Sequence, residues 1–353
     1  MNILERYIAS HVASAIAIVL LIILGLDCLM ALIDQLDRLN DHYTFVGALH
    51  YVALTAPRRL YEFIPLGGLV GAMIGLGMLA SHSELTVMRA AGFSTQRILL
   101  AVFKPVLLLA VMGMVIGQFV APLTERKAQS ARAVALSGDG TFFVRGGVWH
   151  KEGTEYIHIN AVESGDVIHG VTRYQFDDQM QLIRSSHARI GRYAGDVWLL
   201  EQVQETRLLG THTETALLAE ERWNSGLTPD LLAVVVLEPE DLSISGLWSY
   251  TEYLEAQGIK ADTYLLAFWG KLLQPLSIGA LVLIGISFIF GPLRSVPIGQ
   301  RVISGVVLGL VFKFAQDLLG PASTVFGFPP FLAILIPILI CGGAGWLMLR
   351  RAG

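Results

Sequence analysis

The sequence has 353 residues, of which 54% are hydrophobic and only 15% are charged, and its formal net charge is −4. A mean hydropathy of +0.58 is too high for a soluble protein, which could not bury so much apolar sequence in one core. The composition therefore excludes a cytosolic enzyme, a disulfide-rich secreted protein and a disordered chain. The acidic balance excludes a broadly basic nucleic-acid-binding protein, and the widely separated Cys28 and Cys341 suggest no disulfide framework. This is the composition of an integral membrane protein.

Six apolar runs occur in two groups of three, and each is long enough to cross a hydrocarbon core of about 30 Å as a helix. They cover Val12–Ile33, Leu60–Ala80, Ile98–Val120, Leu265–Phe290, Val302–Leu319 and Phe328–Leu349. The first run is too long for a cleaved signal and no small-residue cleavage site follows it, so we expect a retained helix.

The placement of basic residues predicts the orientation of these spans, because short cytoplasmic loops are rich in Lys and Arg. With six spans, one face receives both termini and the loops near residues 81–97 and 291–301. That face contains Arg6, Arg89, Arg97, Arg294, Arg301, Arg350 and Arg351, against Glu5 and Glu84. We therefore expect cytoplasmic termini and an outward-facing central segment.

The central segment, residues 121–262, has the pattern of a β-domain. Apolar and polar side chains alternate in 155–162, 167–176, 181–193 and 197–208, with turn residues between these stretches. We expect a membrane α-helical protein whose two halves, 1–120 and 263–353, flank an inserted all-β, jelly-roll-like domain with helical connectors. The segment contains 12 basic and 21 acidic residues, which again argues against nucleic acid.

No motif for enzyme chemistry is present in the sequence. A phosphate-binding G-x-x-x-x-G-K-[ST] loop, an H-E-x-x-H motif and a G-x-S-x-G turn are all missing, and the nine histidines lack metal-ligand spacing. We therefore predict no cofactor, no metal and no catalytic site.

Glycines recur every four residues in three of the spans. They are Gly67, Gly71 and Gly75, then Gly113 and Gly117, then Gly305 and Gly309. This spacing favours close helix packing, and a moving gate is the alternative.

The segment from Ser81 to Ser94 predicts a short amphipathic helix over about residues 82–93. Ser81 or Ser83 is suited to the N-cap, Glu84 to the first turn and Gly92 to the end of the helix. Leu85, Met88 and Arg89 are three to four residues apart, so they share a face. Such a helix either docks into a groove on a partner or is a solvated connector.

Several longer motifs resemble a known family, the lipopolysaccharide export permeases LptF/LptG, and they are closer to its G-type than to its F-type subunit. The resemblance covers the whole chain and depends on Ser83–Ser94, Asp34–Leu36, Leu227–Asp230, Leu242–Leu247, Trp269–Ser277 and Ser287–Arg301.

The resemblance implies a permease subunit in a bacterial (Gram-negative) inner membrane that pairs with a homologous F-type subunit and a cytoplasmic ABC ATPase dimer. Such a complex extracts lipopolysaccharide and passes it to periplasmic β-jelly-roll bridge proteins. It also implies that Glu84 contacts the ATPase, with Leu85, Met88 and Arg89 as neighbours.

The phosphates of lipopolysaccharide need basic ligands, and the resemblance assigns Arg132 to this role. Arg38, Arg126 and Lys127 lie at a similar depth by sequence, as do Arg58 and Arg59, and each is otherwise an interfacial anchor. Arg38 is the single base at a position where relatives have several lysines.

Lys313 and Asp317 are four residues apart within the fifth span. Ionisable groups at such depth usually face a cavity or a partner. They form either a mutual ion pair or a lateral gate beside the first span of the partner permease.

The leading interpretation is therefore a transport subunit without a nucleotide site of its own. A non-transporting membrane scaffold for an envelope assembly is the alternative from a different class. A membrane enzyme acting on lipid headgroups is a third, for which the sequence offers no catalytic constellation.

Overall fold

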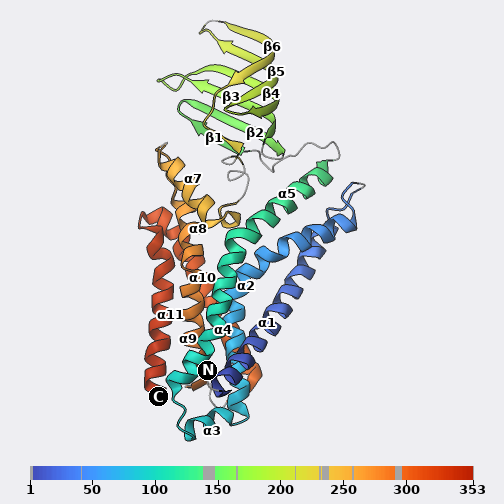
Figure 1. Ribbon diagram of the computed structural model, residues 1–353. Coiled ribbons are helices and arrows are strands. Elements are labelled where there is room, and N and C mark those ends of the chain that lie inside the picture. The colour runs from blue at the N-terminus through green and yellow to red at the C-terminus, as the bar shows by residue number, and fades with distance from the viewer. Residues whose placement is uncertain are drawn as a thin grey trace.

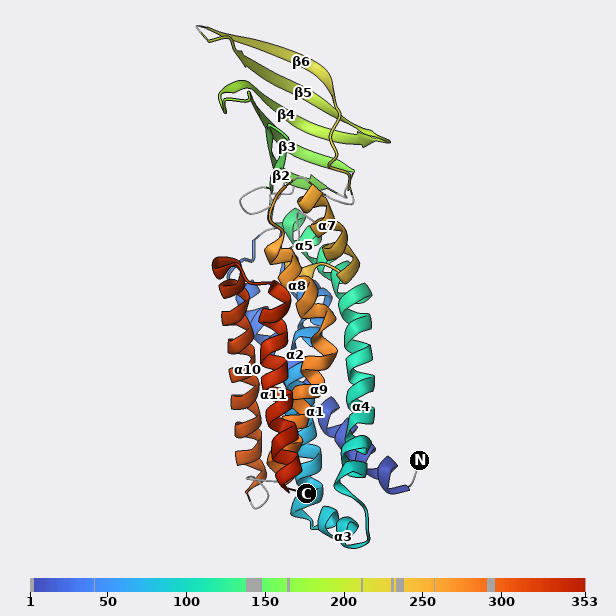
Figure 2. The same ribbon diagram turned by 90° about the vertical axis from the view of Figure 1, so that its left-hand side faces the viewer.

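The computed structural model describes residues 3–40, 42–137, 148–163, 166–210, 212–229, 232, 238–256, 258–290 and 296–352. Arg294 of the basic face and Asp230 of the 227–230 motif lie outside these residues. A bundle of helices carries a β-sheet at one end, and both termini lie at the opposite end, beside α3 (Figures 1 and 2). We refer to the two ends of the bundle as the sheet end and the α3 end.

The helices agree with the two predicted groups of spans. Five helical stretches of the described chain are long and apolar enough to cross a membrane, and a bent pair of helices supplies a sixth span. The first half contains α1 (Ile3–Leu36), α2 (Phe45–Ser81), α3 (Glu84–Ala90), α4 (Thr95–Val115) and the π-helical turn η1 (Ile116–Val120), and the second contains α8 (Asp262–Leu272), α9 (Gln274–Phe290), α10 (Ile298–Phe326) and α11 (Pro330–Ala352). The helical connectors of the central segment are α5 (Ala121–Ser137), η2 (Pro239–Asp241) and α7 (Ile244–Ala256).

The predicted fourth span is not one straight helix. It consists of α8 and α9, which are bent by 54° at Leu273. Pro275 explains the break, because proline has no N–H to donate and its ring clashes with the carbonyl of Lys271, four residues earlier.

The predicted third span is continued well beyond Val120. α4 passes through η1 into α5, so one helical rod extends to Ser137. Within the π-turn, the Gln118 side chain accepts from Ile244 N at 2.8 Å and donates to Ser245 Oγ at 2.9 Å. The irregular turn therefore ties the rod to the first residues of α7.

α2 is the central helix, and all three glycine stripes pack on it or belong to it. A Cβ on Gly75 would lie 2.9 Å from Val12 Cα, and one on Gly71 would overlap the backbone of Ile16, both in α1. The glycines of α4, η1 and α10 lie against Ile64, Tyr61, Met73 and Leu66 of α2. These contacts bear out the expected close packing of helices.

The inserted β-domain is a single six-stranded antiparallel sheet in the order β1-β2-β3-β4-β5-β6, in which each strand pairs with the next along the chain. Its strands are β1 (Val148–Glu152), β2 (Glu155–Glu163), β3 (Val167–Phe176), β4 (Leu182–Ala194), β5 (Val197–Leu208) and β6 (Thr213–Trp223). The four alternating segments identified in the sequence correspond to β2–β5. β6 lacks alternation because residues 213–220 are exposed on both faces of this edge strand.

One face of the sheet buries a core that includes Ile157, Val171 and Trp198. The segment after β6 closes over this core: Leu227 is buried, and its carbonyl accepts from Trp198 Nε1 at 2.7 Å. The sheet also contacts the helices, since the ring nitrogen Nε2 of His150 in β1 lies 3.0 Å from the Tyr253 hydroxyl of α7.

The packing of α1 on α2 gives a first prediction. We expect Gly71→Ala to lower the stability of the purified protein in detergent by about 1–3 kcal/mol, because the new methyl group overlaps the Ile16 backbone. The measurement is thermal unfolding. Gly25→Ala is the matched control, since nothing lies within 4 Å of a Cβ there. Equal unfolding temperatures for the two variants would contradict this account of α1 and α2.

Candidate functional site

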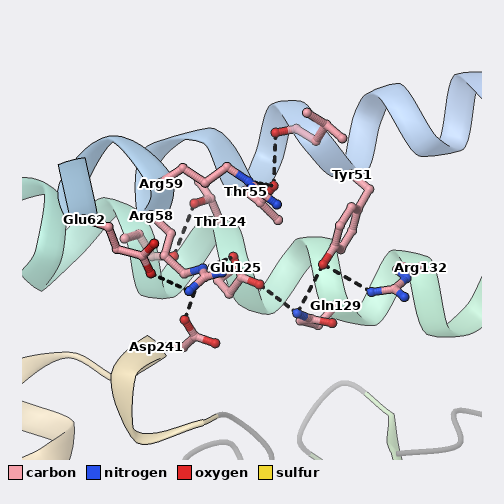
Figure 3. A network of polar contacts seen from close by, with 12 residues as sticks. Tyr51, Thr55, Arg58, Arg59, Glu62, Thr124, Glu125, Gln129, Arg132 and Asp241 are labelled. Atoms are coloured by element: carbon pink, nitrogen blue, oxygen red, sulfur yellow. Dashed lines mark hydrogen bonds and ion pairs between the residues drawn. The ribbon is translucent and has the colours of Figure 1, made fainter. Parts of the chain in front are cut away.

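A polar cluster lies at the sheet end of the bundle, where α2, α5 and η2 meet (Figure 3). We call it the sheet-side cluster. It consists of Tyr51, Arg58, Glu62, Glu125, Gln129, Arg132 and Asp241.

Arg58 is the centre of the sheet-side cluster. Its Nη1 lies 2.6 Å from Glu62 Oε1, and its Nε lies 3.4 Å from Glu125 Oε2 and 3.3 Å from Asp241 Oδ1. The Nε group and the two oxygens facing it are buried, and they do not meet hydrogen-bond geometry. Three carboxylates from three separate segments thus share one guanidinium, attracted by charge but incompletely hydrogen-bonded.

Asp241 shows the electrostatic consequence of this arrangement. Burial raises the pKa of Asp241 to about 6, because desolvation disfavours the charged carboxylate. The positive charge of Arg58 lowers this pKa, and the negative charge of Glu125 raises it further. Desolvation outweighs the attraction of the positive charges of Arg58 and Lys271.

Arg132 lies on the same face of α5 as Glu125 and Gln129, and its side chain lies over the ring of Tyr51 in α2. Its Nη1 donates to the Tyr51 hydroxyl at 3.2 Å, and its guanidinium carbon is 4.9 Å from the ring centroid. Gln129 donates to Glu125 at 2.7 Å and to the Tyr51 hydroxyl at 3.5 Å. It therefore links the Tyr51–Arg132 pair to the carboxylate that faces Arg58. The Nε of Arg132 is buried without a hydrogen-bond partner in the described part of the chain.

The other predicted bases divide into two groups. Arg38 lies at the same end of the bundle, in the turn between the end of α1 and the start of α2. Arg126 and Lys127 follow the buried Glu125 in α5, and both side chains are exposed.

Arg58 and Arg59 are not simple interfacial anchors, because both form ion pairs within the protein. Arg59 Nη1 lies 2.6 Å from Asp27 Oδ2, which joins α2 to α1.

The predicted amphipathic helix is α3, at the opposite end of the bundle. Gly92 has φ +87°, Gly92 N donates to Arg89 O at 3.0 Å and Phe93 N donates to Met88 O at 2.9 Å. This is the Schellman ending expected from a glycine at that position. Ser83 occupies the N-cap position, but neither it nor Ser81 makes the expected capping hydrogen bond, because Ser83 has φ 60° and the Ser81 hydroxyl donates to Met78 O.

Leu85 and Met88 share a face as predicted, but this face turns inward. Both are buried in the core of the bundle, so they attach α3 to the spans. The outer surface consists of Thr86, Val87 and Ala90, of which Val87 is 66% exposed. Glu84 is partly exposed and interacts with the Tyr7 hydroxyl of α1.

A groove of about 520 Å³ lies between α3 and the end of α9. Its lining residues are Ala80, Leu85, Thr86, Arg89, Ala90, Ile289 and Phe290. A groove lined by apolar side chains together with Thr86 and Arg89 can receive an amphipathic segment of another protein.

Lys313 and Asp317 form the mutual ion pair considered above, with 3.3 Å between Nζ and Oδ2. Their side chains are 72% and 53% exposed, on a face of α10 that also exposes Phe314 and Leu318. The pair therefore faces outward from this chain.

Sequence reasoning did not identify Glu125, Asp241 or Lys271 as site residues. Lys271 is buried, and its Nζ lies 5.3 Å from the centre of the Tyr61 ring. Its position within an apolar run was the available signal, because a buried charge needs a partner. Among the described residues, no group of His, Cys, Asp or Glu is arranged to hold a metal ion.

The shifted pKa of Asp241 gives a second prediction. An ordinary aspartate has a pKa of 3.8, and that of Asp241 is about 6, so the folded state binds the proton more tightly. Proton binding by Asp241 therefore stabilises the folded state. This contribution to the free energy of unfolding is fully present below pH 3.8 and is lost as pH rises through 6. We expect Asp241→Asn to remove about 2–3 kcal/mol of this pH dependence.

The measurement is the free energy of unfolding in detergent across this pH range, with the exposed Asp178→Asn as control. A wild-type pH slope in Asp241→Asn would show that Asp241 ionises normally.

Comparison with known proteins gives consistent results across the chain. A family described as "Lipopolysaccharide export system permease LptF/LptG" matches residues 6–351. The chain is 37% identical over 359 residues to the lipopolysaccharide export system permease protein LptG of Escherichia coli K12, covering 99% of each chain. It is also 37% identical over 353 residues to LptG of Haemophilus influenzae, again covering 99% of each.

Proposed function

The chain belongs to the LptF/LptG family of lipopolysaccharide export system permeases, and we propose that it is the G-type subunit of an ATP-driven lipopolysaccharide extractor. In this proposal the spans lie in the inner membrane of a Gram-negative bacterium, with the α3 end in the cytoplasm and the sheet in the periplasm. The observation that carries it is the full-length match to two LptG proteins, on a chain whose described residues include a permease-like helical bundle.

A separate cytoplasmic ABC ATPase dimer supplies the energy in this proposal. The groove between α3 and α9 gives it a docking site, with Glu84 and Arg89 as polar contacts and Val87 on the outer surface. Leu85 and Met88 then transmit movement of α3 to the spans, because they are packed into the bundle core.

The sheet end receives the lipid headgroup. Arg132 is already oriented by Tyr51, so its remaining donors can bind a phosphate without a large loss of side-chain entropy. Arg38 adds positive charge at this end, and the exposed Arg126 and Lys127 extend it along α5.

The F-type permease and the bridge proteins have separate surfaces on this chain. α1 and α10 expose large apolar faces, which suits lipid or a second permease, and Lys313 and Asp317 lie on the α10 face as part of a lateral gate. The exposed edge of β6 has unpaired backbone groups that a strand from a periplasmic β-jelly-roll protein can extend.

Reconstitution tests the proposal. The chain is purified with its co-expressed F-type and ATPase partners, placed in vesicles containing lipopolysaccharide, and assayed for ATP-dependent transfer of lipid to a soluble acceptor. Transfer supports a permease. Stable assembly without ATP-dependent transfer would support a scaffold and overturn the proposal.

Glu84 provides a prediction about energy coupling. We expect Glu84→Ala to reduce recovery of the ATPase with the chain, or to leave hydrolysis intact while lipid transfer falls, because the carboxylate is the negative group at the start of α3. The exposed Glu255→Ala in α7 is the matched control. Normal recovery and normal transfer in Glu84→Ala would remove Glu84 from the coupling contact.

Arg132 provides a prediction about the lipid. A charge-assisted hydrogen bond contributes about 1.5–3 kcal/mol, so we expect Arg132→Glu to weaken lipopolysaccharide binding by about ten- to a hundredfold. Arg132→Lys keeps the charge but not the two parallel donors, and binding is expected to be partial. Photo-crosslinking to lipopolysaccharide measures the effect, and basal ATP hydrolysis should not change.

Arg126→Glu makes the same charge change at an exposed position of α5 and is the comparison variant. Equal losses in the two Glu variants would mean that general repulsion, and not the position of Arg132, determines binding.

A further inference from the structure

A buried arginine fastens α10 to α2 at the α3 end of the bundle. Arg301, in the first turn of α10, is only 2% exposed, and its Nη1 donates to Gly77 O at 2.6 Å. Gly77 lies near the end of α2, seven residues before Glu84, where α3 begins. The contact therefore joins two segments that are far apart in the sequence.

Gly77 leaves room for the guanidinium beside α2. A Cβ on Gly77 would lie 2.8 Å from Nη1 and 3.3 Å from Cδ of Arg301, so a larger side chain there requires the flexible end of Arg301 to move. The contact between α10 and α2 continues one turn further along α10, since a Cβ on Gly305 would lie 2.8 Å from Met73 Sδ. We call this row of α10–α2 contacts the contact line. Arg301 is thus seated at the end of a close helix contact.

α10 depends on this contact line because much of its surface is uncovered. Val311, Phe314 and Leu318 are exposed on its outer face. A hydrogen bond from a guanidinium to a carbonyl, made away from water, is directional and stronger than the surrounding apolar contacts. Together with the contacts of Gly305 and Gly309, it holds α10 against α2.

The α2 end of the contact is also tied to α3. α3 packs against α2, and Leu85 and Met88 of α3 are buried in the helical core that also contains Leu76 and Leu79, on either side of Gly77. This packing gives a displacement of α3 a route to the turn of α2 that holds the Arg301 acceptor.

We propose that Arg301 is a positioning residue that makes α10 follow the α3 end of α2, so that movement of α3 changes the placement of the exposed face of α10. This inference rests on the proposed function in one respect, namely that α3 receives the driving movement. The fastening of α10 by Arg301 is independent of that function.

The first experiment uses the chain by itself in nanodiscs. Spin labels are placed at the exposed Val307 of α10 and Val87 of α3, with Cys28 and Cys341 replaced by Ala. We expect a narrow distribution of label-to-label distances in the chain that keeps Arg301 and Gly77. The distribution should be broader or shifted in Arg301→Met, and also in Gly77→Ala, which disturbs the same contact from α2. Arg350→Met removes an exposed arginine from the same end of the bundle and is the control.

The second experiment uses the complete complex with its ATPase and F-type partners. In the complex the α3 label is moved to the exposed Met78 of α2, because Val87 lies in the proposed ATPase contact. We expect ATP to change the distance between the labels at Met78 and Val307 with Arg301 present and to change it little in Arg301→Met. Lipid transferred per ATP should fall about tenfold, the effect of one charge-assisted hydrogen bond, while the rate of ATP hydrolysis stays within about twofold. Arg301→Lys should restore part of the transfer, because it returns one donor.

The outcomes separate the two proposals. An unchanged distance distribution and unchanged lipid transfer per ATP in Arg301→Met would overturn the role of Arg301. Absence of ATP-dependent transfer with Arg301 in place would instead overturn the proposed function, and the distances in the chain by itself would still decide whether Arg301 fastens α10. If Arg301→Met does not fold, Arg301→Lys and Gly77→Ala provide the same comparison.

Discussion

The close approach of neighbouring helices to α2 is the constraint on which the rest of the structure depends. Lipid tails are as apolar as leucine, so helices in a membrane gain little from hydrophobic burial and associate through close packing. Gly71 and Gly75 bring α1 to the backbone of α2, and Gly305 brings α10 against the Met73 side chain of α2. α1, α3, α4, α5, α9 and α10 all pack directly against this central helix.

Ionic groups are buried at both ends of α2, and each joins segments that packing alone would leave separate. Arg58 connects α2 to α5 and to η2, which precedes α7 and the second group of spans. Arg301 connects α10 to Gly77. Buried charges are costly unless they are paired, so these contacts provide directional links that apolar packing cannot. The pairing of Arg58 is incomplete in hydrogen-bond terms, which is why burial dominates the pKa of Asp241.

Much of the fold could be predicted because it follows from local patterns. The six apolar runs, the alternating segments of the inserted domain and the end of α3 at Gly92 are confirmed. The surroundings of the expected site residues could be predicted less well than the fold. Leu85 and Met88 do share a face, but periodicity identifies a face without saying what covers it, and here the spans do.

The sequence by itself determined which segments span the membrane, where the β-domain is inserted and which family the chain resembles, because hydropathy, alternation and motifs are properties of neighbouring residues. Tertiary structure alone decided that Arg58 meets Glu125 and Asp241, that Arg132 lies over Tyr51 and that Arg301 reaches Gly77. These partners are separated by tens to hundreds of residues, and no local pattern encodes which charged groups meet. The packing of the helices around α2 fixes those distances, and the cost of burying a charge requires that each group find a partner.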